Sequence, residues 1–583
     1  MLRAARMFSV LAVPAATLLQ SASALAAPAK PTPQSLQAKA PTAEGLTFAD
    51  VAKLPRPGSQ GVAMAKFSPC GKWLTHLSSA DGSLTTQLYA TDVATGSTKL
   101  AFAAGEAGEP LSKEEQMRRE RARIMATGVT SYAWASKADA LLVPSDGAVF
   151  VKDGVDGAAK RLFDPAAFPD VGAGPVLDPK ISDDGATVAF VWDDEVCAVD
   201  ASGGAPRRLT DGARGVAGVT NGAADLVAAE EMDRYDGFWL APGGKTVAYE
   251  SVDETGVLEI HIPRPGDAAG TEETHRYPFA GAANPKVRLG AVATAGGATT
   301  WLDLGAAGLG EDVYLARVDW ADATTVLATV QSRDQRTLRV VAYDVATGAG
   351  RVALEDTRKD AWLNLHDALR WGIEKDEVLY ASEKDGFRRL YVHDASSGAE
   401  KRCLTAGPLV VEDLVGVEGG VVYFLGNDAA NACRQRHLYK VPYDGSEAPR
   451  RITEAGYTDA AAVSKDGAVF LQRSTAATPV VAELRAKGAT TVLKDSSDDP
   501  RAAGLQPPKP FETTSTDGAA TLHGSLYLPD AAVHGPGPYP TLVSCYGGPH
   551  VQYRRPGREF EHAGRHLRSQ TTSSRRARSA RTS

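Results

Sequence analysis

Cysteine is scarce in this sequence, and basic residues are not in excess. Five cysteines are spread over 583 residues, at positions 70, 197, 403, 433 and 545. They form no C-x-x-C pair and no close Cys/His cluster, which argues against a metal site and against a small fold held together by disulfides. Mostly buried free thiols are therefore expected, although Cys403 and Cys433 could pair in an oxidising compartment.

Basic surfaces and long apolar runs are also largely missing. The formal net charge is −8 at pH 7, which gives no basis for a nucleic-acid partner. A long apolar stretch occurs at 7–19, between a charged start and an A-x-A site that ends at Ala26, and none follows later. This pattern predicts a signal peptide over 1–26, a periplasmic or secreted protein and no membrane span. An N-terminal anchor is the alternative, which Pro14 and the short run disfavour.

The sequence does contain a repeat, between about residues 60 and 500. Each copy has a turn with Asp or Gly, a short strand, a second strand that ends in a carboxylate, and another Gly-containing turn. The clearest copies begin at Phe67, Trp134, Ile181 and Leu240, and weaker ones begin at Val318, Gly372 and Val463. Such repeats predict a mainly β fold, a seven- or eight-bladed β-propeller. An array of β-sandwiches is the alternative, disfavoured because the turn recurs at blade length.

Residues 111–125 interrupt the repeat and predict an inserted helix. Ser112 and Glu115 have the spacing of a capping box, and acidic residues precede basic ones along the segment. Taken alone, the segment would also suit a solvated surface helix.

Glu230 and Glu231 are adjacent, between an apolar stretch and the start of a repeat copy. In a propeller, side chains at this place turn toward the interior. Two neighbouring carboxylates in a confined site repel each other unless a cation offsets their charge, and the ammonium group of a ligand would supply one. A charged turn that faces solvent is the alternative interpretation.

Near the C-terminus, residues 538–550 read as an apolar strand that runs into a Gly-Gly loop, which is typical of the opening of an α/β-hydrolase sheet. The elbow G-x-S-x-G, which presents the nucleophilic serine in that fold, occurs nowhere in the sequence. Residues 554–583 contain nine Arg, no Lys and almost no apolar residues, so a disordered tail is expected. A shifted reading frame explains this composition better than a basic tail that binds nucleic acid or lipid.

Several longer motifs all resemble those of one protein family. They are Glu230 to Arg234 before Phe238 and Trp239, HRYPFAGAANPKV at 275–287, SRDQR at 332–336, SEKDGFRRLY at 382–391 and CYGGP at 545–549. With these motifs the chain resembles, over most of residues 45–553, the dipeptidyl peptidase IV branch of the prolyl oligopeptidase clan of serine peptidases. The expected order is the signal peptide at 1–26, a linker at 27–59, the propeller at 60–505, the start of an incomplete α/β-hydrolase domain at 506–553 and the tail at 554–583.

The resemblance also implies an activity and a site. Enzymes of this type release dipeptides from N-termini, preferably after proline or alanine, and neither a metal nor a cofactor is expected. Glu230 and Glu231 would hold the free α-amino group of a peptide. Arg119 or Arg121 would hold a substrate carbonyl, and the sequence does not decide between them and Arg123. Tyr546 would stabilise the oxyanion of the tetrahedral intermediate.

The catalytic Ser, Asp and His follow Tyr553 in the order of the family, so this chain is expected to lack hydrolytic activity. Full-length relatives are often dimers, which makes a homodimer of the full-length form an expectation as well. The second functional hypothesis is a non-catalytic propeller that binds peptides or a partner protein.

Overall fold

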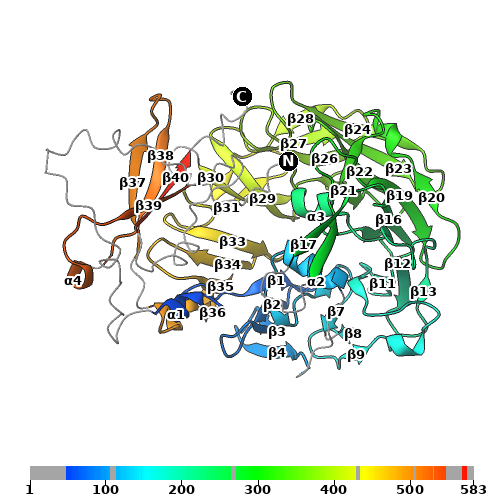
Figure 1. Cartoon of the computed structure of the whole chain (residues 1–583), viewed down its shortest axis with the longest axis horizontal. Helices are drawn as coiled ribbons and strands as arrows, with labels where there is room; N and C mark the ends of the chain where they lie inside the picture. The colour runs from blue at the N-terminus through cyan, green and yellow to red at the C-terminus, as the bar shows by residue number, and fades with distance from the viewer. Residues whose placement is uncertain are drawn as a thin grey trace.

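The computed structural model has the architecture of a β-propeller, with antiparallel sheets arranged radially around a common centre (Figure 1). The structure describes residues 47–105, 113–145, 147–263, 271–428, 434–502, 507–529, 531–545 and 567–573. Within these residues the ring has eight blades, six of four strands and two with a fifth strand. The predicted mainly β propeller is therefore confirmed, and the number of blades is eight.

The first four blades extend from β1 to β20. Blade 1 has β1 (Ala63–Phe67), β2 (Trp73–Ser78), β3 (Thr85–Asp92), β4 (Thr98–Phe102) and β5 (Thr127–Gly128), and blade 2 has β6 (Ala133–Trp134), β7 (Ala140–Ser145), β8 (Ala148–Asp153) and β9 (Lys160–Arg161). Blade 3 has β10 (Leu177–Ile181), β11 (Thr187–Trp192), β12 (Glu195–Asp200) and β13 (Arg207–Arg208). Blade 4 has β14 (Val219–Asn221), β15 (Phe238–Leu240), β16 (Thr246–Asp253), β19 (Lys286–Ala293) and β20 (Thr300–Leu302), with an inserted hairpin of β17 (Glu259–Pro263) and β18 (Glu272–Arg276).

The other four blades extend from β21 to β36. Blade 5 has β21 (Val313–Trp320), β22 (Thr325–Ser332), β23 (Thr337–Asp344) and β24 (Gly350–Thr357), and blade 6 has β25 (Arg370–Trp371), β26 (Glu377–Ser382), β27 (Arg389–Asp394) and β28 (Glu400–Cys403). Blade 7 has β29 (Leu409–Glu418), β30 (Val421–Asp428), β31 (His437–Pro442) and β32 (Arg450–Arg451). Blade 8 has β33 (Thr458–Val463), β34 (Val469–Ser474), β35 (Val481–Ala486) and β36 (Ala489–Asp495). Short 3-10 helices occur at Pro165–Ala167, Leu304–Ala307 and Ser496–Asp498.

Local hydrogen bonds explain why the repeat forms strand–turn–strand units. In the turn before β11, Ser182 donates from Oγ to Asp184 at 2.5 Å and accepts from the Thr187 amide at 2.9 Å. Gly185 in this turn has φ of 75°, which a glycine adopts without a steric penalty. At the end of β23, Asp344 accepts from the amide of Thr347 at 2.8 Å. Asp92 and Asp394 accept in the same way, so a carboxylate at the end of these strands closes the following turn.

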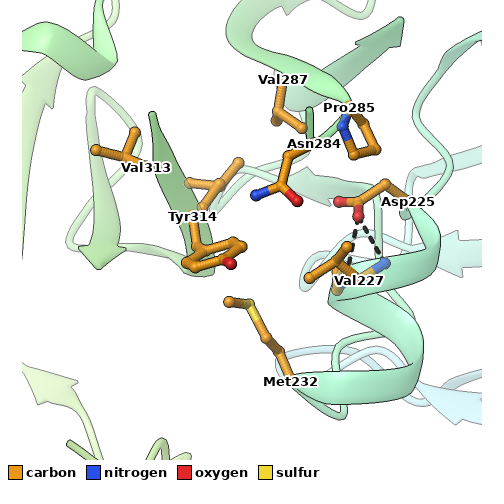
Figure 2. A pocket seen from close by; sticks show the side chains of 10 residues that line it. Asp225, Val227, Met232, Asn284, Pro285, Val287, Val313 and Tyr314 are labelled. Atoms are coloured by element: carbon orange, nitrogen blue, oxygen red, sulfur yellow. Dashed lines mark hydrogen bonds between the residues drawn. The ribbon is translucent and has the colours of Figure 1, made fainter. Parts of the chain in front are cut away.

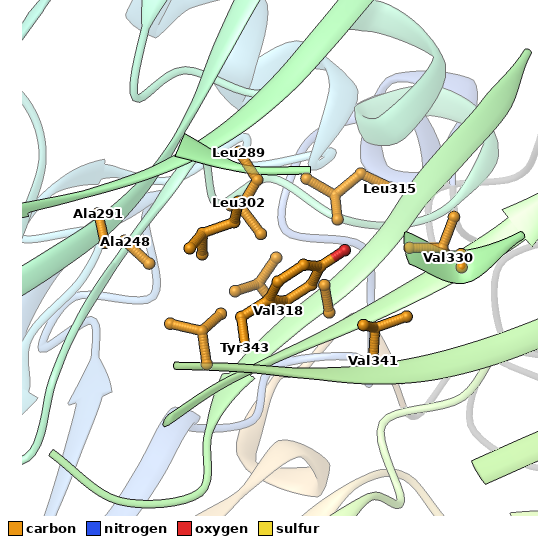
Figure 3. Close-up of a cluster of buried hydrophobic side chains, with 12 residues drawn as sticks. Ala248, Leu289, Ala291, Leu302, Leu315, Val318, Val330, Val341 and Tyr343 are labelled. Atoms are coloured by element: carbon orange, nitrogen blue, oxygen red, sulfur yellow. The ribbon is translucent and has the colours of Figure 1, made fainter. Parts of the chain in front are cut away.

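Apolar side chains between neighbouring blades form the core. Tyr343 of blade 5 is fully buried among side chains of blades 4 and 5 that include Leu289, Leu302 and Val330 (Figure 3). Its hydroxyl donates to the carbonyl of Asp303 at 2.7 Å, so the buried phenol is satisfied. Because each blade buries its faces against its neighbours, the ring is stable as a whole.

Blade 8 closes the ring against blade 1. The Val62 amide donates to Oε1 of Gln472 at 2.9 Å, across a sequence separation of 410 residues. Val62 and Leu74 pack with Phe470 and Leu484 in one apolar cluster. The linker before blade 1 also contains α1 (Phe48–Ala52), and Arg501 donates to the carbonyl of Pro55 at 2.9 Å.

A second sheet follows the propeller and lies beside it (Figure 1). It contains β37 (Lys509–Thr514), β38 (Thr521–Leu526), β39 (Thr541–Cys545) and β40 (Leu567–Ser573), in the order β37-β38-β40-β39, and α4 (Ala531–His534) precedes β39. Arg434 lies 3.6 Å from Glu512 and links the sheet to the propeller. That this sheet begins an α/β-hydrolase domain stays a prediction.

Strand β40 corrects the expectation of disorder for part of the tail. It pairs antiparallel with β38 and parallel with β39, through residues 567–573 of the segment 554–583. Ladder pairing uses backbone groups, and this stretch contains threonines, which favour strands, so pairing does not require a buried apolar face. The rest of the tail and the signal peptide at 1–26 lie outside the described residues.

The cysteines differ from the expectation of mostly buried thiols. Cys197 is buried, and burial raises its pKa to about 12. Cys403 is a half-buried free thiol, whereas Cys70 and Cys545 are exposed. Cys433 lies outside the described residues, and Cys403 forms no disulfide within them.

Candidate functional site

The paired glutamates lie at the end of a short helix, α3 (Leu226–Glu231), between β14 and β15 of blade 4. Asp225 caps its N-terminus by accepting from the amides of Val227 and Ala228 at 2.8 and 3.1 Å. Ala228 and Ala229 are the buried face of the helix. Glu230 and Glu231 are therefore its last two residues, and both are half-buried. Figure 1 shows α3 near the centre of the ring.

The inserted helix is α2 (Lys113–Arg121), and it packs beside α3. The predicted helix is confirmed, while Ser112 of the expected capping box lies outside the described residues. Nε of Arg119 donates to Glu115 of the same helix at 2.6 Å. Burial and the charge of Asp225 raise the pKa of Glu254, and the charge of Arg121 opposes that rise. Arg119 is thus directed to Glu115 and not to the glutamate pair.

Arg123 lies close to Glu230 of this pair. Its Nη2 atom is 4.0 Å from Oε2 of Glu230, and its side chain is 63% exposed. The amides of Arg123 and Ile124 donate to the carbonyls of Glu120 and Arg119, which is the Schellman pattern at the end of α2. In this pattern Arg123 takes the left-handed position that normally holds glycine, with φ of 58°. A residue with Cβ is strained there, and such strain concentrates at functional sites.

A buried ion pair lies behind α3. Arg234, only 4% exposed, donates from Nη1 and Nη2 to the two carboxylate oxygens of the fully buried Glu250, both at 2.8 Å. The same guanidinium donates to the carbonyls of Asp236 at 2.5 Å and Leu315 at 3.2 Å. It also lies 3.9 Å from Asp225 at the start of α3. Burial raises the pKa of Glu250, and Arg234 opposes that rise.

A second group of charges lies between α2 and the propeller. Nζ of Lys180 is 2.6 Å from Asp236 and 3.1 Å from Asp178, and it donates to the Phe238 carbonyl at 2.7 Å. Burial raises the pKa of Asp178 to about 6. Burial lowers the pKa of Arg118 of α2, but Glu115, followed by Asp178 and Asp236, raises it above the usual value. Arg118 of α2 thus feels the negative charges of Asp178 and Asp236 on blades 3 and 4.

Two cavities flank this region. One, of about 230 Å³, lies between blades 4, 5 and 6, and its walls include Arg234, Asp236, Asp319 and His366. Burial lowers the pKa of His366 to about 3, so its imidazole is neutral at pH 7. The other, of about 20 Å³, holds no more than a water molecule or so.

Figure 2 shows this small cavity on the side of α3 that faces blade 5. Asp225 lies at the start of the helix, and the side chain of Met232, past its end, points toward the ring of Tyr314. The Asn284 amide lies between the Tyr314 ring and Asp225. Its Nδ2 atom has no hydrogen-bond partner among the described residues. The helix is therefore packed along its length against blade 5.

The structure brings Arg123 within 4.0 Å of Glu230, and Glu231 follows Glu230 at the end of the same helix. It does not test the oxyanion role of Tyr546, which lies outside the described residues. Sequence reasoning assigned no role to Arg234 and Glu250. Arg234 is part of the quoted Glu230-to-Arg234 run, but its partner Glu250 is 16 residues away, and no sequence pattern singles it out.

Among the described helices, none combines the length and apolar character that a membrane span requires. The described residues also bring no three His, Cys, Asp or Glu side chains together in a way that could hold a metal ion.

The fold and this site define a β-propeller domain with a charged, arginine-flanked carboxylate pair near its centre. The model of the "Dipeptidyl peptidase IV (DPP IV) N-terminal region" matches residues 139–479, more than half of the chain. The chain therefore belongs to the dipeptidyl peptidase IV family.

The chain is also similar to several curated dipeptidyl peptidases, and it shares the fold of a solved structure. Dipeptidyl peptidase 8 of Homo sapiens is 27% identical over 551 residues, covering 76% of this chain and 59% of that protein. Venom dipeptidyl peptidase 4 of Vespa velutina is 30% identical over 264 residues, covering 42% of this chain and 34% of that protein. The crystal structure of Porphyromonas gingivalis dipeptidyl peptidase 4 matches with a TM-score of 0.70 at 21% identity, covering 88% of this chain and 72% of that one. This chain thus spans about three fifths of the length of dipeptidyl peptidase 8.

Proposed function

We propose that this chain is the substrate-recognition propeller of a secreted or periplasmic dipeptidyl-peptidase-IV-like serine exopeptidase, which releases dipeptides from N-termini after proline or alanine. The observation that carries the proposal is the placement of Glu230 and Glu231 at the end of α3, with Arg123 beside them. The family relationship and the names of its members support the peptidase class.

The chemistry of the pair suits a peptide N-terminus. Glu230 and Glu231 are adjacent, half-buried carboxylates at the C-terminal end of a helix, where the helix dipole adds negative potential. An α-ammonium group has three N–H donors and a positive charge, and ionised carboxylates only accept hydrogen bonds. The ligand would therefore relieve a repulsion that the free protein contains.

Arg123 would hold a carbonyl of the same peptide. Its guanidinium is largely exposed and lies close enough to Glu230 to share one ligand with it. An arginine offers several N–H donors in a fixed plane, so it can donate to a carbonyl while it stays near a carboxylate. This proposal prefers Arg123, which lies 4.0 Å from Glu230, to Arg119, which donates to Glu115, and to Arg121.

The chemical step would need groups beyond the propeller. Tyr546 is proposed to donate to the oxyanion, but the 583 residues contain no G-x-S-x-G nucleophile elbow. A polypeptide of these residues is therefore proposed to bind peptides without cleaving them. Export through the segment at 1–26 and dimerisation of the full-length form belong to the same proposal.

Calorimetric titration with the tripeptide Ala-Pro-Ala and its N-acetylated form tests the recognition step. The free tripeptide should bind, and acetylation should weaken binding by about tenfold or more, because it removes a charge-assisted contact. Equal affinity for the two forms would favour the second hypothesis, a non-catalytic propeller that binds peptides by other contacts. Absence of binding for both would overturn the amine-recognition proposal.

A further inference from the structure

We propose that Arg234 is a positioning residue, which fixes the direction in which α3 presents Glu230 and Glu231. This inference rests on the proposed function, because it concerns the glutamate pair that would bind the peptide amine. Arg234 itself does not reach the ligand: it lies behind the helix and is 4% exposed. We call Arg234, Glu250 and Asp225 the α3 clamp.

The clamp holds both ends of α3. Oδ1 of Asp225 caps the first turn through the amides of Val227 and Ala228, and the other carboxylate oxygen lies 3.9 Å from Nη2 of Arg234. The backbone amide of Arg234 donates to the carbonyl of Ala228 at 2.9 Å. One residue thus contacts the cap of the helix with its side chain and the last turn with its backbone.

The clamp also ties α3 to two blades. Glu250, which takes both guanidinium nitrogens, belongs to β16 of blade 4, and the Leu315 carbonyl belongs to β21 of blade 5. The Asp236 carbonyl, a third acceptor, lies in the segment that leads from α3 into β15. A six-residue helix has little stability of its own, so its orientation depends on such tertiary contacts.

The turn after α3 needs such support. Asp233 has φ of 53°, in the left-handed region that residues with Cβ rarely adopt. This residue stands between the glutamate pair and Arg234. A strained turn persists when the surrounding structure over-determines it, and the bonds of Arg234 on its far side supply that constraint.

An ion pair that only stabilises the fold and one that positions α3 would respond differently to substitution by apolar side chains. A buried pair can be replaced by apolar side chains with little loss of stability, or even with a gain, whereas loss of one partner is strongly destabilising. Stability can therefore be restored without Arg234. The bonds to the Leu315 and Asp236 carbonyls, which only the guanidinium makes, would not be restored.

Arg234→Lys would keep the positive charge but would lose the bidentate hydrogen bond to the Glu250 carboxylate. Arg402 offers a matched control. It donates to Glu377 at 3.1 and 2.8 Å and to the Tyr443 carbonyl at 3.1 Å, in blades 6 and 7, away from α3.

The experiment compares the full chain with Arg234→Lys, Arg402→Lys and the double variant Arg234→Met/Glu250→Met. It measures thermal melting, calorimetric affinity for Ala-Pro-Ala and hydrogen exchange of the amides at 226–232. We expect Arg234→Lys to lose at least tenfold in affinity and to exchange faster at 226–232. Arg402→Lys should keep the wild-type affinity and the wild-type exchange at 226–232. It should lose less thermal stability than Arg234→Lys, because the Arg402 side chain is 26% exposed and that of Arg234 is 3% exposed. The double variant should recover its melting temperature without recovering its affinity.

Two results would overturn the inference. One is an affinity of Arg234→Lys that equals the wild-type value, and the other is a double variant that regains affinity together with stability. If the wild-type chain does not bind Ala-Pro-Ala, the proposed function fails. The hydrogen-exchange data then still test whether Arg234 fixes α3. Unchanged exchange at 226–232 in Arg234→Lys would contradict that role without reference to peptide binding.

Discussion

Nη2 of Arg123 lies 4.0 Å from Oε2 of Glu230, although Arg123 belongs to the end of an inserted helix and Glu230 to blade 4. The contact joins α2 to α3 and gives the glutamate pair a cationic neighbour that is largely exposed. It also places a residue with Cβ in the left-handed position of a Schellman cap.

Arg123→Gly is expected to stabilise the propeller while weakening peptide binding. Glycine adopts the φ of 58° without the strain that a side chain incurs, which contributes roughly 1 kcal/mol. Urea denaturation measures the first effect and calorimetry with Ala-Pro-Ala the second. Arg119→Ala is the control and should leave the affinity near the wild-type value. A stabilised variant with full affinity would remove Arg123 from the site.

Glu230→Gln and Glu231→Gln should each weaken binding of a free N-terminus. Each substitution replaces a charge-assisted contact worth about 1.5 to 3 kcal/mol, so the dissociation constant should rise roughly ten- to a hundredfold. The melting temperature should change little, because the pair is half-buried and receives a ligand. Loss of folding together with binding would mark the pair as structural.

His76 makes the propeller less stable in acid. It is 3% exposed, neither ring nitrogen has a hydrogen-bond partner among the described residues, and burial lowers its pKa to about 4. The unfolded chain, with a pKa near 6.5, binds the proton more readily, so stability is full above about pH 6.5 and falls as the pH drops toward 4.

His76→Phe should remove this part of the pH dependence, since a phenyl ring fills a similar space beside Tyr89 and takes no proton. Melting curves between pH 4 and pH 8 measure the effect, with the exposed His261→Gln as control. A pH dependence equal to that of the wild type would show that another group titrates.

The 583-residue chain should not hydrolyse a dipeptidyl chromogenic substrate. A nucleophile and its base supply most of the rate in serine peptidases, and an oxyanion donor alone has no intermediate to stabilise. The assay compares the purified chain with a buffer blank. Turnover that persists through a second purification would contradict the expectation.

The propeller could be predicted from the sequence because its signal is local. The serine and aspartate side chains of the repeat bond to amides two to five residues away, as Ser182 and Asp344 do, so the pattern is visible in any short window. Glu230 and Glu231 can be singled out from the sequence as adjacent charges beside a repeat copy, and their role stays a prediction.

The rest of the site depends on contacts between distant residues. Arg123 is chosen because of how α2 ends and where it packs. The sequence of this segment contains several arginines and does not distinguish among them. The positioning role proposed for Arg234 depends on its hydrogen bonds to Glu250 and to the carbonyl of Leu315, which is 81 residues away. Strand β40 was missed because its partners β38 and β39 lie outside the tail and its pairing uses backbone groups.

A crystal structure of the chain in complex with Ala-Pro-Ala would show directly whether the glutamate pair binds the peptide amine. We expect the α-ammonium nitrogen within about 3 Å of carboxylate oxygens of both Glu230 and Glu231, with Arg123 donating to a peptide carbonyl. A peptide bound elsewhere in the propeller, or bound with its N-terminus turned away from the pair, would contradict it.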